Sequence, residues 1–95
     1  MTEHSRPLER QATTVYEHLS ATAELPLERD VSRWLGEAQA VANDATTDGL
    51  EAETIRKRIG QVDQLLSEVD GTGHDKADRH VEVARGICRE ILEEP

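Results

Sequence analysis

The sequence has no phenylalanine, one tryptophan, one tyrosine and only two lysines among its 95 residues. Its single cysteine, Cys88, excludes an internal disulfide and gives no sign of an oxidising compartment. No apolar run exceeds three residues, which argues against a membrane-spanning helix, and the polar N-terminus has no signal-peptide core. These absences predict a cytoplasmic protein.

Acidic side chains dominate what is present. Twenty Asp and Glu stand against 11 Lys and Arg, for a formal net charge of −9. Carboxylates hold water and hydrated K⁺ and Na⁺ ions nonspecifically at the surface, which keeps a protein soluble in concentrated salt. The balance indicates an acidic, halophilic protein. It argues against nucleic acid and anionic membranes as partners, because their phosphates require clustered Lys and Arg.

Four stretches repeat apolar residues at helical spacing, and no stretch alternates as a strand does. We predict helices over residues 7–23, 26–45, 49–70 and 75–93, separated by short connections that force neighbours to run antiparallel. The fold class is therefore all-α, an antiparallel up-down-up-down bundle of four helices. We expect one domain over residues 6–95 after a disordered tail at 1–5.

The apolar stripes define the expected core. Their members, in chain order, are Leu8, Ala12, Val15, Leu19 and Ala23; Leu27, Val31, Trp34, Leu35, Ala38, Val41, Ala42 and Ala45; Ile55, Ile59, Val62, Leu66 and Val69; and Ala77, Val81, Ala84, Cys88 and Ile91. The first stripe is the weakest, so the first helix could dock loosely on a three-helix core. Pro26 suits the first turn of the second helix, and Asp48 with Glu51 has the spacing of a capping box.

One cluster has metal-ligand types: His74, Asp75, Asp78 and His80. Two of them, His74 and Asp78, have the i, i+4 spacing that brings ligands together on a helix. However, aspartates in a first turn also complement the positive end of a helix. We therefore interpret the cluster as helix capping, and predict no metal site and no cofactor.

The alternative to a non-enzymatic domain is an enzyme, a metal-dependent all-α hydrolase that acts on nucleotides. Such enzymes hold Mg²⁺ between carboxylates one turn apart on two facing helices. Here the turn-spaced pairs, Asp75 with Asp78 and Glu90 with Glu93, fall on one helix. We predict no catalytic residue, and Cys88, on the core stripe, is expected to be unreactive.

Two arginines, Arg29 and Arg33, lie one turn apart on the same side of the second predicted helix. They could hold a phosphate or a carboxylate of a partner. In so acidic a chain we expect them to pair with neighbouring acids instead.

Three glycines, Gly36, Gly60 and Gly86, fall inside predicted helices, where each costs about 1 kcal/mol relative to Ala. Either they are tolerated surface positions, or they let another backbone approach closely. On the second reading, a possible interaction surface consists of Ser32, Gly36, Ala40, Asn43 and Gly86. We therefore favour a non-enzymatic protein–protein interaction domain whose partner is another protein or a second copy in a homodimer.

The stretch from Glu24 to Gly73 contains ELPLERDVSRWLGEAQAVA and IRKRIGQVDQLLSEVDGTG. It resembles a group of small, uncharacterised haloarchaeal proteins. The likeness covers about half of the chain and rests on helix and loop patterns. It implies a haloarchaeal, cytoplasmic origin and carries over no functional residue.

Overall fold

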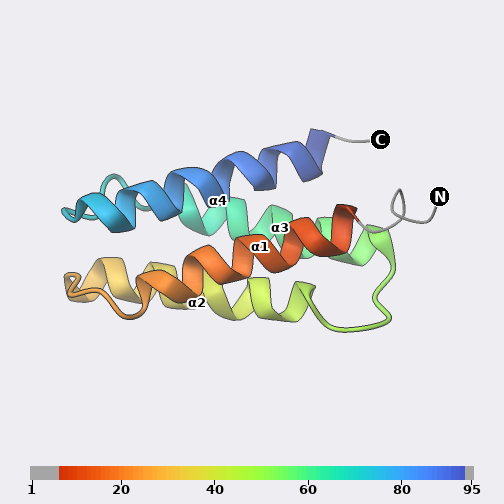
Figure 1. Ribbon diagram of the computed structural model, residues 1–95, viewed down its shortest axis with the longest axis horizontal. Helices are drawn as coiled ribbons and strands as arrows, with labels where there is room; N and C mark the ends of the chain where they lie inside the picture. Colours follow the sequence, from red (N-terminus) through yellow and green to blue (C-terminus); the bar gives the residue numbers. More distant parts are fainter. Residues whose placement is uncertain (1–6, 94–95) are drawn as a thin grey trace.

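The computed structural model describes residues 7–93 as four α-helices in an antiparallel bundle (Figure 1). The helices are α1 (Pro7–Thr22), α2 (Arg29–Ala45), α3 (Ala52–Leu66) and α4 (Asp75–Glu93). No strand occurs within residues 7–93, and the predicted all-α bundle is confirmed. The tail expected at residues 1–5 lies outside the described residues.

The four helices stand at the corners of a square. Helix α1 packs mainly against α4, and α2 mainly against α3, while α1 also contacts α2 and α3 also contacts α4. Across the square, α1 approaches α3, whereas the described parts of α2 and α4 do not touch. The α1–α2 and α3–α4 connections share the left end of the bundle in Figure 1, and the α2–α3 connection lies at the other end. An outer face of α2 is therefore separate from any face of α4.

Helix α2 begins three residues later than predicted, because Pro26 does not open it. The N-cap is Glu28, with φ −63° and ψ 155°, and the preceding residues are not helical. Proline has no backbone N–H to donate within a helix, and its fixed φ suits the extended conformation of this segment. Leu27, outside the helix, still packs against the core from this segment.

Helix α3 also begins later than predicted. Gly49 has a φ of +84°, a left-handed conformation that an α-helix cannot contain. The N-cap is Glu51, whose side chain makes no capping hydrogen bond, so the predicted capping box with Asp48 is wrong.

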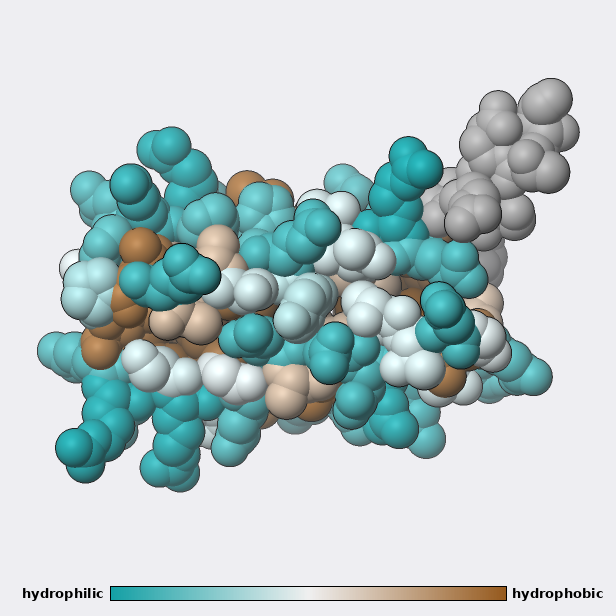
Figure 2. Space-filling view, turned by 60° about the horizontal axis from the view of Figure 1, so that its bottom comes forward, coloured by the Kyte–Doolittle hydropathy of each residue, from teal (hydrophilic) through white to brown (hydrophobic). Residues whose placement is uncertain are grey.

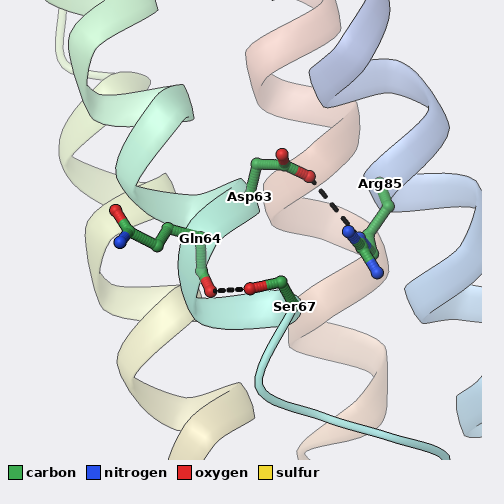
Figure 3. A network of polar contacts seen from close by, with 4 residues as sticks. All are labelled: Asp63, Gln64, Ser67 and Arg85. Atoms are coloured by element: carbon green, nitrogen blue, oxygen red, sulfur yellow. Dashed lines mark hydrogen bonds and ion pairs between the residues drawn. The ribbon is translucent and has the colours of Figure 1, made fainter.

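Helix α3 ends at Leu66, four residues before the predicted end, and the next side chain closes it. The Ser67 hydroxyl donates a 2.6 Å hydrogen bond to the backbone carbonyl of Gln64 (Figure 3). The last carbonyls of a helix have no partner farther along it, so such a bond satisfies one of them. Val69 lies beyond the helix, yet it still packs against the core.

The core is built from one stripe of each helix. Its buried members are Ala12, Val15 and Leu19 from α1; Leu35, Ala38, Ala42 and Ala45 from α2; Ile55, Ile59, Val62 and Leu66 from α3; and Ala77, Val81, Ala84, Cys88 and Ile91 from α4. All of them were predicted. Five other predicted members are only partly buried and pack against this core: Leu8, Leu27, Val31, Val41 and Val69. Two predicted members do not join it, since Ala23 is exposed beyond the end of α1 and Trp34 is partly buried without packing against the core.

Helix α1 is part of this core. Three of its apolar side chains, Ala12, Val15 and Leu19, are 0% exposed. Because α1 contacts all three other helices, the expectation of loose docking is wrong. The weak stripe misled because α1 has few apolar residues, but three of them are fully buried.

Candidate interaction surface

The outer face of α2 carries the small residues singled out by the sequence. Ser32, Gly36, Ala40 and Asn43 are all exposed, and they recur at steps of one helical turn. The buried side chains of α2, Leu35 among them, lie on the other side of the helix. We call these four residues the α2 strip.

Gly36, at the middle of the strip, is not required by packing inside the chain. A Cβ atom added there would meet no atom within 4 Å. Gly60 differs, because its added Cβ would lie 3.8 Å from the Leu92 side chain, an ordinary contact. Gly36 therefore destabilises α2 by about 1 kcal/mol relative to Ala, because of its low helix propensity. No packing contact within the chain compensates for this loss.

Gly86 belongs to another face. It is exposed on α4, and a Cβ there would also meet no atom within 4 Å. Because α4 and α2 stand at opposite corners of the bundle, Gly86 and the α2 strip cannot form one continuous surface. Gly86 instead borders an open hollow of about 410 Å³ beside the α3–α4 connection, with Arg85 and Arg89 in its lining.

The α2 strip borders a smaller hollow. This hollow has a volume of about 140 Å³ and opens between the end of α1, the α1–α2 connection and α2. Its lining includes Thr22, Leu27, Leu35 and Gly36. Figure 2 looks onto the side of the bundle formed by α1 and α2, and much of its apolar surface (brown) gathers at the left end, where the α1–α2 connection lies. This end of the face can therefore accept an apolar side chain.

The face of α2 around the strip has no acidic residue. At 100° per residue, the positions within about 60° of Gly36 are Arg29, Ser32, Arg33, Gln39, Ala40 and Asn43. The guanidinium groups of Arg29 and Arg33 are exposed and make no hydrogen bond or ion pair to another described residue, so the expected pairing with neighbouring acids is wrong. In a chain of net charge −9, this face therefore carries no carboxylate and two guanidinium groups without an acidic partner among the described residues.

The cluster at the start of α4 is a structural one. His74 caps the helix, since its Nδ1 accepts a 3.2 Å hydrogen bond from the backbone N–H of Lys76. Asp78 does not cap the helix: its carboxylate accepts hydrogen bonds from the Thr72 backbone N–H, at 2.8 Å, and the Thr72 hydroxyl, at 2.7 Å. These two bonds, the backbone one first, lower the pKa of Asp78. Asp78 therefore holds the α3–α4 connection in place.

The fourth member of that cluster, His80, turns away from the others toward α1. Among residues 7–93, no three side chains of His, Cys, Asp or Glu are grouped so that they could hold a metal ion. The described residues therefore offer no metal centre for the alternative function, a metal-dependent hydrolase. Cys88 is fully buried, as predicted, and burial raises the pKa of its thiol to about 12, far from the range of a reactive cysteine.

Replacing Thr72 with Val should lower the free energy of unfolding by about 0.5–1.5 kcal/mol, the net contribution of a typical hydrogen bond, because it removes the buried hydroxyl that donates to Asp78. Chemical denaturation measures the change. The matched control is Thr47→Val, at an exposed position in the α2–α3 connection. Equal effects of the two substitutions would show that the Thr72 hydroxyl contributes nothing.

Polar side chains also link α4 to its neighbours. Arg85 on α4 reaches Asp63 on α3, with 3.5 Å between Nε and Oδ1 (Figure 3). Toward α1, the Nδ1 atoms of His80 and His18 lie 2.9 Å apart. Sequence reasoning missed His18, because its partner is 62 residues away and on another helix. Burial, then the charge of His80, lowers the pKa of His18, while Glu17 acts in the opposite direction.

Comparison with known families gives one match. The family model for the domain of unknown function DUF8152 matches residues 11–95. The chain belongs to this family. The match includes all four helices of the DUF8152 bundle except the first turn of α1. No curated protein and no solved structure matches the chain. In the described part of this DUF8152 domain, no helix is both long and apolar enough to cross a membrane.

Proposed function

We propose that this DUF8152 domain is a non-enzymatic interaction module that pairs with a second copy of itself through the outer face of α2. The observation that carries the proposal is Gly36. A glycine in mid-helix costs about 1 kcal/mol relative to Ala, and nothing within 4 Å of its missing Cβ explains it. A second helix crossing at Gly36 does explain it, because glycine lets another backbone approach closely.

The charges of α2 favour a second copy as the occupant. Two chains that each carry a net charge of −9 repel one another, and this repulsion is weakest where both present a face without carboxylates. The free guanidinium of Arg29 lies seven residues before Gly36, and Asn43 lies seven residues after it. If a two-fold axis passes through Gly36, Arg29 of one copy lies against the Asn43 end of α2 in the other copy. The acidic residue Asp44 comes directly after Asn43 at that end.

The hollow beside Gly36 supports the same contact. It gives the edge of the α2 strip an opening of about 140 Å³, lined by Leu27 and Leu35 among others. An interface needs such a pocket for an apolar side chain, because buried anchors contribute most of the binding energy. The small residues of the strip bring the second copy near enough to fill it.

We further propose that the protein works in a cytoplasm of high salt, as in the haloarchaeal proteins that the sequence resembles. The net charge of −9 supports this environment. The free thiol of Cys88 is consistent with a reducing compartment. High salt also favours the proposed pairing, because it screens the repulsion between two acidic chains.

Replacing Gly36 with Ala should have two opposite effects. The folded monomer should gain about 1 kcal/mol from helix propensity, since the added methyl meets no atom of its own chain. Association should weaken, because the methyl keeps the second helix from its closest approach. Thermal melting at low protein concentration measures the first effect, and sedimentation at matched high salt measures the second. A variant that gains stability and associates as well as the wild type would refute the proposed contact.

A further inference from the structure

The paired imidazoles of His18 and His80 have no role in the proposed pairing through α2. They stand on α1 and α4, with their ring centroids 5.2 Å apart and the ring planes tilted by 49°. Both side chains are partly exposed. A small ion can therefore reach the Nδ1 atoms from solvent.

We propose that His18 and His80 form a two-histidine site for a divalent transition-metal ion that clamps α1 to α4. Imidazole nitrogen is a preferred ligand of Cu²⁺, Ni²⁺ and Zn²⁺. Two such nitrogens on separate helices already face each other at 2.9 Å. Water molecules complete the coordination, since no group of three ligand side chains occurs among residues 7–93.

The two rings need only a small rotation to bind one ion. In the hydrogen-bonded pair the two Nδ1 atoms point at each other, and they must turn toward a common point when the metal enters. With metal–nitrogen bonds of about 2.05 Å, two ligand nitrogens lie about 3 Å apart, so the helices already hold the rings at a suitable spacing. Among divalent first-row ions, nitrogen sites bind Cu²⁺ most tightly. The site should therefore bind Cu²⁺ more tightly than Ni²⁺ or Zn²⁺.

The proton balance permits metal binding to the neutral pair of imidazoles. In the paired state, one Nδ1 carries the proton and donates it to the lone pair of the other Nδ1. When the metal binds, that proton moves to Nε2 of the same ring, so both Nδ1 lone pairs become ligands and no net proton is released.

Thermal melting of the full chain with and without Ni²⁺, in a buffer free of chelators, tests the site. The metal should raise the melting temperature of the wild type, since it binds the folded chain and joins two helices. His18→Gln and His80→Gln should each weaken Ni²⁺ binding about tenfold or more, because either removes one of only two protein ligands. His4→Gln is the control and should keep the wild-type shift.

Each variant is compared with itself, with and without metal, so a change in its basal stability does not obscure the result. Cu²⁺ should give a larger shift than either Ni²⁺ or Zn²⁺. The proposal is overturned if Ni²⁺ leaves the wild-type melting temperature unchanged, or if His18→Gln retains the full shift. Because these variants lie away from α2, their outcome is independent of the proposed pairing.

Discussion

Replacing Leu19 with Ala should lower the free energy of unfolding by about 2–5 kcal/mol, the range for large-to-small substitutions in a packed core. Leu19 is fully buried in the last turn of α1, so the substitution removes apolar contacts and leaves a cavity. The total stability of a small domain is about 5–15 kcal/mol. The variant should therefore be close to unfolding in moderate denaturant, as urea titration would reveal.

The control for this substitution is Leu92→Ala. Leu92 is the same residue type in a helix, but it is 40% exposed on α4, and its loss should cost well under half as much. If Leu19→Ala costs no more than Leu92→Ala, α1 does not belong to the cooperative core, and the looser docking that the sequence suggested would return.

The second large effect concerns salt. Raising KCl from ~0.1 M to ~2 M should increase the melting temperature by ~10 °C or more, about 2 kcal/mol for a domain of this size. At low salt the net charge of −9 opposes the compact state through self-repulsion. Concentrated salt screens that repulsion within a few ångströms and also strengthens apolar burial.

A variant with fewer carboxylates separates the two causes. Glu37, Glu53 and Glu68 are exposed on three different segments, so replacing all three with Gln removes charge at little cost to packing. This variant should melt higher than the wild type at low salt and respond less to KCl. A wild-type melting temperature that stays flat over the range would remove the halophilic interpretation.

The helices could be predicted because their apolar residues recur at a fixed period. The helical period that predicts Leu35 on the core face of α2 also predicts Gly36 on its outer face, and the structure agrees with both. The helix ends were less predictable, because they depend on single backbone conformations. The left-handed φ of Gly49 and the hydrogen bond from Ser67 to Gln64 set the two ends of α3, and neither has a periodic signal.

Contacts between helices could not be predicted from the sequence. The pairing of His18 with His80 requires knowing which faces of α1 and α4 meet, and at what height along the bundle. The bond between Thr72 and Asp78 could not be predicted for a related reason. Asp78 lies in the first turn of α4, as expected, but the loop also folds back so that Thr72 donates to its carboxylate. Sequence spacing describes a single element and does not record what packs against it.

Sedimentation equilibrium at ~2 M KCl, where charge repulsion is screened, tests the proposed pairing most directly. The wild type should shift from monomer to dimer as its concentration rises. Gly36→Leu should remain monomeric, because its side chain occupies the crossing point of the two helices. Gly86→Leu, an equally exposed glycine on the opposite corner of the bundle, should dimerise like the wild type. A wild type that stays monomeric at every concentration, or a Gly36→Leu variant that dimerises normally, would contradict the account.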